Sequence, residues 1–187
     1  MPKNRFQWTI ILVIFALLGS AWIILSQEPA TAEQSPVTLT EAPIVGHLAP
    51  DFTAQTALGQ TINLQELQTE GGMAGQPIVL NFWASWCAPC RVEMPHFQSA
   101  SRNYNGRVTI LGVNQGESAK IVNDFGNEFN ITYPLLVDDE NEVNHLYNVN
   151  SLPTTIFVGA DGVVQEVLVG TISQAVLEDR IESLLTK

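Results

Sequence analysis

The chain has 187 residues, of which 45% are hydrophobic, and a formal net charge of −11. This length allows one compact domain with its own core plus an appendage, and such a core folds without the help of disulfides. The acidic balance argues against nucleic acid as a ligand, because phosphate binding requires clustered lysine and arginine, and only six of the eight basic residues lie beyond the first five positions.

The N-terminal segment predicts a single membrane crossing. Residues 1–5 form a short basic flank, and residues 6–25 contain no charged side chain. About 20 apolar residues at roughly 1.5 Å rise each span the ~30 Å hydrocarbon core, and a basic flank stays in the cytoplasm. The rest of the chain is therefore expected on the exported side. The alternative is a cleaved signal peptide with a processing site at Ala30-Thr31-Ala32, although the apolar run is longer than a usual h-region.

A flexible linker and one folded domain are expected after this segment. Residues 26–45 are rich in Pro, Thr, Ser, Ala and Glu and show no hydrophobic period, which is typical of a solvated linker. Residues 46–187 alternate between short apolar runs and stretches of helical period. This alternation predicts an α/β fold in which a mixed sheet is covered on both sides.

The elements of this domain can be placed in chain order. We expect strands at 52–56 and 61–64, a strand at 78–84 followed by a helix that reaches 104, a strand at 108–114, a helix at 121–129, a strand at 135–137, a helix at 142–147, strands at 154–158 and 163–169, and a final helix. The apolar residues Ile121, Val122, Phe125 and Phe129 mark the first of the two middle helices, and Val143, Leu146 and Tyr147 are predicted to face inward from the second. Asp161-Gly162 favours a type I′ hairpin turn, and Ser173 is the expected cap of the last helix.

Cys87 and Cys90, the only cysteines, follow the predicted strand at 78–84. A disulfide that closes so short a loop removes little denatured-state entropy, so a structural staple is a weak explanation. At the start of a helix, the Cys87 sulfur would face unpaired first-turn N–H groups, which lower the pKa of a cysteine from about 8.5. Cys90 lies one turn further on the same face. We therefore predict that Cys87 attacks a partner's disulfide and that Cys90 resolves the mixed disulfide.

Metal binding is the main alternative to redox exchange. A structural zinc site needs four ligands, and His47, His96 and His145 show no ligand spacing relative to the cysteines. Two thiolates could still hold Cu(I), which leaves an exported copper chaperone as an open alternative. The favoured interpretation requires no metal and no cofactor.

Two motifs together resemble a known superfamily. The stretch WCAPC (86–90) after the predicted strand, joined later by SLPTT (151–155), is similar to the thioredoxin superfamily and, within it, to the membrane-anchored TlpA/ResA-type thiol-disulfide oxidoreductases. The similarity covers roughly residues 45–187. It implies a thioredoxin-like three-layer fold with an N-terminal hairpin and with a helix and strand inserted at 117–137.

The resemblance also implies roles for individual residues. Pro153 matches a cis-proline beside the cysteines, where the backbone at Leu152 pairs with a bound substrate segment as an added strand. Trp86 matches the aromatic residue that precedes the attacking cysteine, although partial burial for packing would also explain it. Asn81 stands where thioredoxin has a buried carboxylate. Glu93 matches an acidic residue of ResA-type reductases that could raise a cysteine pKa or carry its proton; the alternative is a solvent-facing helix glutamate.

A reducing role is expected from the residues around the cysteines. Ala88 and Pro89 cannot donate to a thiolate or pair with it, whereas Arg91 could stabilise it and Glu93 would oppose it, so the Cys87 pKa should be only moderately lowered. An exported reductant must be recharged from across the membrane. The resemblance implies a membrane electron donor of the CcdA or DsbD type, and a disulfide-containing exported substrate such as apocytochrome c. A peroxiredoxin-like peroxidase would need threonine at the position of Ala84.

Overall fold

The computed structural model describes residues 5–25, 39–69 and 75–186. These residues fall into two compact units, Met1–Thr38 and Leu39–Lys187. In the first unit, the segment predicted as a membrane anchor forms helix α1 (Arg5–Leu25). Over the described ranges, no helix combines the length and the apolar character that crossing a membrane requires. The predicted processing site Ala30-Thr31-Ala32 lies outside the described residues.

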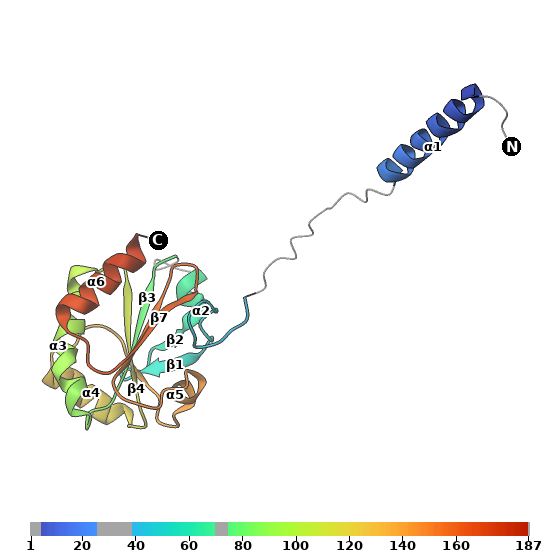
Figure 1. Ribbon diagram of the computed structural model, residues 1–187. Coiled ribbons are helices and arrows are strands. Elements are labelled where there is room, and N and C mark those ends of the chain that lie inside the picture. The colour runs from blue at the N-terminus through green and yellow to red at the C-terminus, as the bar shows by residue number, and fades with distance from the viewer. Residues whose placement is uncertain (1–4, 26–38, 70–74, 187) are drawn as a thin grey trace. The chain divides into compact units, whose positions relative to one another are not determined.

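A mixed sheet forms the centre of the second unit (Figure 1). Over residues 39–69 and 75–186, its seven strands are β1 (Thr53–Thr56), β2 (Thr61–Asn63), β3 (Ile78–Trp83), β4 (Thr109–Asn114), β5 (Leu135–Val137), β6 (Thr154–Val158) and β7 (Val164–Val169). They lie in the order β2-β1-β5-β4-β3-β6-β7, with β3, β4 and β5 parallel and the other neighbouring pairs antiparallel. The predicted α/β fold with a mixed sheet is thereby confirmed.

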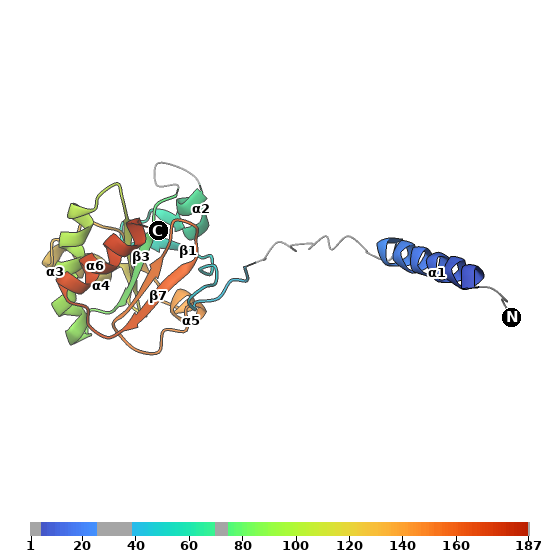
Figure 2. The same cartoon turned by 45° about the horizontal axis from the view of Figure 1, so that its top comes forward.

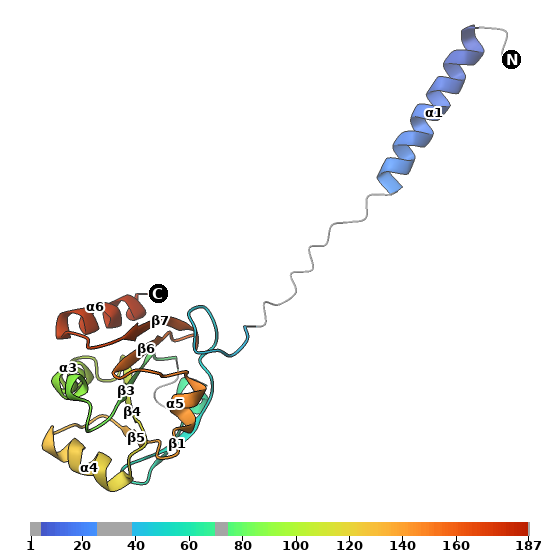
Figure 3. The same cartoon turned by 60° about the horizontal axis from the view of Figure 1, so that its bottom comes forward.

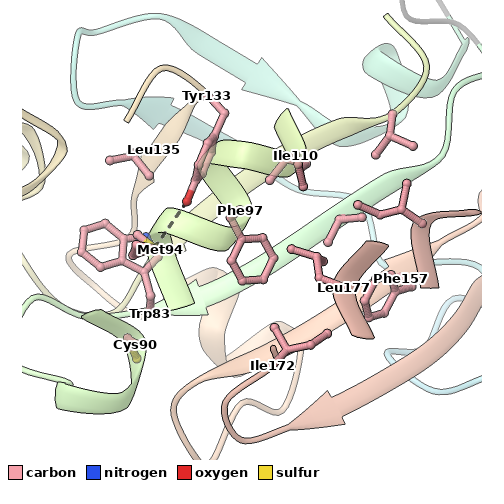
Figure 4. Close-up of a cluster of buried hydrophobic side chains, with 14 of the residues drawn as sticks. Trp83, Cys90, Met94, Phe97, Ile110, Tyr133, Leu135, Phe157, Ile172 and Leu177 are labelled. Atoms are coloured by element: carbon pink, nitrogen blue, oxygen red, sulfur yellow. Dashed lines mark hydrogen bonds between the residues drawn. The ribbon is translucent and has the colours of Figure 1, made fainter. Parts of the chain in front are cut away.

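Helices cover both faces of this sheet (Figures 2 and 3). One face is covered by α3 (Ala88–Asn103), α4 (Ala119–Glu128) and α6 (Gln174–Leu185), and the other by α2 (Leu64–Thr69) and α5 (Glu142–Leu146). Each face therefore has a hydrophobic cluster of its own, and the cluster under α3 and α6, shown in part in Figure 4, includes both cysteines.

Strand β3 contributes to both clusters because successive side chains of a strand point to opposite faces. Val79 and Trp83 belong to the cluster under α3, whereas Leu80 and Phe82 belong to the cluster on the other face. This alternation explains why the strand reads as an unbroken apolar run, since all of its residues are buried. It also places Asn81 on the side that faces α3.

Three local predictions differ from the structure. Of the apolar residues that mark the two middle helices, Ile121 and Leu146 are 43% and 41% exposed. The others named for the inner faces, among them Val122 and Val143, are buried or half-buried as predicted. In the β6–β7 connection, Gly162 has a positive φ of 79° but Asp161 does not. A type I′ turn requires positive φ at both central residues, so this turn type is wrong.

Candidate active site

The two cysteines lie at the junction between β3 and α3. Cys87 is the N-cap of α3, and the backbone N–H of Cys90 donates a hydrogen bond to its Sγ at 3.3 Å. The two sulfurs are joined in a disulfide, and the Cα atoms are 5.3 Å apart. Pro89 lies in the first turn, where its missing N–H removes no helical hydrogen bond. The predicted placement of Cys87 at the amide-rich end of a helix is therefore confirmed.

The two sulfur-bearing residues differ in their access to solvent. Cys87 retains 5% of its exposure, and Cys90 retains none. The residues around Cys87 are open to a partner, since Trp86 is 68% exposed and Ala88 and Pro89 are also exposed. A protein that approaches this end of α3 therefore meets Cys87 first, across an uncharged surface of an indole and two small apolar residues.

The loop before β6 lies against the same cluster. The Leu152–Pro153 peptide bond is cis, as the resemblance implies. Leu152 is half-buried and packs against the cluster that contains both cysteines, while Pro153 is buried. The Pro153 carbonyl accepts a hydrogen bond from the Gly170 N–H at 2.8 Å, which ties the loop to the end of β7.

Glu93 is buried, so the alternative of a solvent-facing glutamate is wrong. Its Oε1 accepts a hydrogen bond from Asn81 Nδ2 at 2.8 Å, and its Oε2 accepts one from the Ile172 N–H at 2.9 Å. Burial raises the pKa of this carboxyl to about 7, although the two hydrogen bonds act in the opposite direction. The carboxylate that thioredoxin carries at the position of Asn81 is therefore replaced by one on the facing helix, one turn beyond Cys90.

Tyr133 is a buried titratable group close to Glu93. Its hydroxyl donates to Met94 Sδ at 3.3 Å, as the dashed line in Figure 4 shows. Burial raises the pKa of the Tyr133 phenol strongly, and the charge of Glu93 raises it further. The phenol thus stays neutral near pH 7, whereas the Glu93 carboxyl, three residues after Cys90 on α3, has its pKa in that range.

Arg91, the residue that could stabilise the thiolate, has its guanidinium group over two aromatic rings. Its guanidinium carbon lies 5.2 Å from the ring centroid of Phe125 and 4.8 Å from that of Phe129. It forms an ion pair with Glu128, and its Nη1 donates to the Ser85 carbonyl at 3.4 Å. The positive charge of Arg91 is therefore engaged with α4 and with the loop before Cys87.

Sequence reasoning missed Glu117, whose carboxylate is buried beside the cysteine loop. This carboxylate accepts hydrogen bonds from the Ser85 N–H at 2.7 Å, from the Ser85 hydroxyl and from Asn114 Nδ2 at 2.7 Å. The Glu117 N–H in turn donates to Asn114 Oδ1 at 3.1 Å. Asn114 is the last residue of β4, and it donates through its side-chain amide, so the pair is not a helix capping box and no local sequence motif marks it.

Two of the three histidines have a backbone carbonyl oxygen close to a ring nitrogen. His96 Nδ1 lies 3.1 Å from the Ile172 carbonyl oxygen, and His47 Nδ1 lies 3.5 Å from the Val45 carbonyl oxygen. Among the described residues, no group of three or more His, Cys, Asp or Glu side chains is arranged to hold a metal ion.

A Cys-x-x-Cys disulfide at the N-terminus of a helix, after a central buried strand and with a cis-proline in the same unit, defines a thioredoxin-like thiol-disulfide oxidoreductase. Comparison with known proteins supports this class. Residues 45–167 match the model of the AhpC/TSA family, and the chain belongs to this family.

Individual relatives carry matching names. The chain is 35% identical over 140 residues to the thioredoxin-like protein YneN of Bacillus subtilis, covering 73% of this chain and 78% of YneN. It is 35% identical over 141 residues to the thiol-disulfide oxidoreductase ResA of Geobacillus kaustophilus, covering 75% of this chain and 78% of ResA. A crystal structure from Chlorobium tepidum, described as a thiol:disulfide interchange protein DsbE, matches with a TM-score of 0.68 at 26% identity, covering 76% of this chain and 98% of that chain. The enzyme is thus a ResA-like thiol-disulfide oxidoreductase.

Proposed function

We propose that this oxidoreductase reduces disulfides in exported partner proteins through Cys87 and Cys90. The observation that carries the proposal is the position of Cys87 at the N-cap of α3, with a first-turn N–H directed at its sulfur and with Cys90 buried behind it. A helix N-terminus favours negative charge, so the Cys87 thiolate is stabilised where a partner can reach it.

The exchange proceeds in two displacements. The Cys87 thiolate attacks one sulfur of the partner's disulfide; that bond breaks, a mixed disulfide forms, and the partner's other sulfur leaves as a thiolate that takes up a proton. Cys90 then loses its proton and attacks Cys87 Sγ. The partner leaves with two thiols, and the protein holds the Cys87–Cys90 disulfide that the structure contains.

We assign the proton transfer at Cys90 to Glu93. The carboxyl is buried one turn further along α3, and its pKa of about 7 lets it take up and release a proton near neutral pH. Asn81 and the Ile172 N–H hold its two oxygens in place. The charge of Glu93 in its ionised form also disfavours a second negative charge on Cys90, which keeps this thiol protonated until it is needed.

The direction of electron flow is argued from the few groups that stabilise the thiolate. Ala88 and Pro89 offer it no donor, and the guanidinium of Arg91 is paired with Glu128. We therefore expect a reduction potential closer to the roughly −270 mV of thioredoxin than to the roughly −120 mV of DsbA. Equilibration of the full chain with a glutathione buffer measures it, and a value near that of DsbA would show that the protein is an oxidant instead.

We also propose that the catalytic unit works on the exported side of the membrane, held by residues 6–25 and recharged by a donor of the CcdA or DsbD type. The support is the uncharged run at these positions and the basic flank before it. Protease added to intact spheroplasts should degrade the unit, and alkaline carbonate should leave the chain in the membrane pellet. Protection from protease would place the unit in the cytoplasm and overturn the proposal.

A trapping experiment in cells tests the exchange and identifies the partner. Cys90→Ser removes the resolving thiol, so the mixed disulfide on Cys87 should accumulate as a band that disappears under reducing conditions. Cys87→Ser is the matched control, because it keeps one buried thiol but loses the attacking one. An apocytochrome c with its cysteine pair is the expected captured protein. If both variants capture equally little, Cys87 does not attack protein disulfides.

Two other functions make different predictions. A peroxiredoxin-like peroxidase requires threonine where this chain has the buried Ala84, so the purified chain should not turn over peroxide. A Cu(I) chaperone would bind copper tightly through Cys87 and Cys90 and would fail to reduce insulin. Measuring insulin reduction, peroxide consumption and copper binding on one sample distinguishes the three.

A further inference from the structure

Ser85, two residues before Cys87, has a partner for each of its hydrogen-bonding groups. Its N–H donates to Glu117 Oε2 at 2.7 Å, and its hydroxyl donates to Glu117 Oε1. Its carbonyl oxygen accepts a hydrogen bond from Arg91 Nη1 at 3.4 Å. Both partners are charged side chains, and hydrogen bonds to charged groups are stronger than those between neutral groups.

Both of these side chains are tied to α4. Glu117 lies two residues before the first residue of this helix, Ala119. Arg91 lies over the ring of Phe125 and forms an ion pair with Glu128, the last residue of the helix. Ser85 is therefore connected to both ends of α4. The Glu117 carboxylate links it to the start of the helix, and the Arg91 guanidinium links it to Glu128 at the end.

The Glu117 carboxylate is itself held in place. Glu117 is only 8% exposed, and the Asn114 amide donates to Oε2 at 2.7 Å. The Asn114 carbonyl accepts a hydrogen bond from Asn144 Nδ2 at 3.2 Å, and the same amide nitrogen donates to Asp138 Oδ2 at 2.6 Å. A polar network thus runs from Asp138 to Ser85, and its members lack the freedom to rotate independently.

Ser85 belongs to the turn that leads into Cys87. The Cys87 N–H donates to the Ala84 carbonyl at 3.2 Å, so Ser85 and Trp86 form the two central residues of a turn that ends at Cys87. The sulfur then meets the Cys90 N–H at 3.3 Å. A contact of this kind weakens when its atoms move by about half an ångström, so a side chain that fixes the turn also fixes the thiolate's donor.

We propose that Glu117 is a positioning residue of the redox pair: through Ser85 it holds the turn that directs Cys87 Sγ at the first-turn N–H of α3. The inference rests on the proposed function, in which Cys87 is the attacking group. It gives the inserted helix α4 a role in the reaction, because α4 supports the turn from outside the cysteine motif.

Glu117→Gln is the informative substitution. A glutamine has one acceptor oxygen in place of two, so at least one of the three donors on the carboxylate loses its partner. If Glu117 acts by positioning, the thiolate loses stabilisation, and alkylation of Cys87 at pH 7 should be three- to tenfold slower. If its charge merely opposed the thiolate, removal of that charge would make alkylation faster. The direction of the change therefore separates the two effects.

The measurement uses the purified full-length chain with Cys90→Ser, so that iodoacetamide reacts at Cys87 alone, over pH 5 to 10. Asp124→Asn is the matched control, because it removes an exposed carboxylate of α4 that pairs with Lys120. Ser85→Ala keeps the Glu117 carboxylate and loses only the hydroxyl contact, so it should change the rate in the same direction by a smaller factor. It also serves as the test if Glu117→Gln does not fold.

The outcomes separate this inference from the proposed function. Slower alkylation in Glu117→Gln and Ser85→Ala, with Asp124→Asn unchanged, supports positioning. A pH–rate profile that is unchanged within twofold, or a faster reaction, overturns it, even if the variant is less resistant to urea. Insulin reduction by the wild-type chain is measured separately: its absence would overturn the proposed function, whereas the alkylation profile requires no protein substrate.

Discussion

The buried carboxylate beside the cysteines lies on a helix, where the thioredoxin pattern has it on a strand. Asn81 on β3 supplies an amide, and Glu93 on α3 supplies the acid that this amide holds at 2.8 Å. This arrangement keeps one ionisable group, Glu93, in the interior and places a neutral hydrogen-bond donor, the Asn81 amide, beside it. A second carboxylate at position 81 would instead have produced two like charges in contact, of which one would have to stay protonated.

Glu93 makes the stability of the fold depend on pH. Its pKa is about 7 in the folded chain, compared with 4.5 as the ordinary value. Well below pH 4.5 the carboxyl is protonated in both the folded and the unfolded state. Between the two pKa values the unfolded state has already lost this proton while the folded state still holds it, and near pH 7 the folded state loses it too. The free energy of unfolding should therefore fall between about pH 5 and pH 8, by an amount on the order of 3 kcal/mol.

Glu93→Gln should remove this dependence. The variant's free energy of unfolding should be similar to that of the wild type at pH 5 and higher at pH 8, as measured by urea denaturation of the disulfide form at both pH values. Glu140→Gln is the control, since Glu140 is exposed. Parallel pH profiles for the wild type and Glu93→Gln would contradict the prediction.

The sequence predicted the features of the site that depend on neighbouring residues better than the features that depend on residues far along the chain. Cys87 at a helix N-cap follows from a buried strand, a short turn and a helical period, which all lie within about twenty neighbouring residues. The burial of Glu93 depends on Ile172, which is 79 residues away, and the role of Glu117 depends on Ser85, which is 32 residues away. Spacing along the chain does not show contacts that the tertiary fold creates.

Among the elements, the strands were easier to predict than the faces of the short helices. An apolar run bounded by polar residues fixes a buried strand such as β4, whatever its neighbours are. In α4 and α5, apolar residues lie next to each other or on both flanks, as Ile121 and Val122 do. The hydrophobic period of such short helices identifies the centre of the buried stripe, as at Val122, but it does not fix the edge of the stripe, where Ile121 and Leu146 remain exposed.

Helix α6 illustrates how packing holds an element beside the site. Ser173 caps it, with its hydroxyl accepting a hydrogen bond from the Val176 N–H, and the preceding Ile172 supplies the N–H that holds Glu93. Leu177 is completely buried near Phe157 in the cluster that contains the cysteines (Figure 4). The loop that leads into this helix therefore connects the helix directly to the buried carboxylate.

Leu177→Ala should lower the free energy of unfolding by about 2 to 5 kcal/mol, because it removes buried methyl groups and leaves a cavity. Val176→Ala is the matched control on the next residue, which is 40% exposed, and it should change stability by less than about 1 kcal/mol. Urea denaturation at one fixed pH compares the two. If both variants lost the same small free energy of unfolding, the interior would have repacked to fill the cavity that Leu177→Ala leaves, and the prediction would be wrong.

For the whole molecule, the excess of acidic residues predicts which partners are met fastest. The chain has 19 aspartate and glutamate residues and 8 lysine and arginine residues. A field of this sign attracts basic segments and repels acidic ones, and association rates respond by a factor on the order of 10 or more at low salt. The residues around Cys87 are uncharged, so they do not distinguish substrates by charge. The long-range field of the whole molecule therefore makes the main electrostatic distinction between basic and acidic substrates.

Two model peptides with the same disulfide loop, one flanked by lysines and the other by glutamates, test this. The reduced protein should react about tenfold faster with the basic peptide at 20 mM salt, and the two rates should converge at high salt as screening shortens the range of the field. Stopped-flow Trp fluorescence is suited to the measurement. A difference that persists unchanged at high salt would indicate direct contacts instead.

The central sheet divides the interior into two hydrophobic clusters, and only the one beneath α3, α4 and α6 contains sulfur that reacts. The cluster beneath α2 and α5 lies on the opposite face of the sheet from both cysteines, and α5 is connected to the cysteine turn through Asn144 and its polar network. Apolar substitutions in this second cluster that keep its volume should therefore change the resistance of the protein to heat more than they change the reactivity of Cys87.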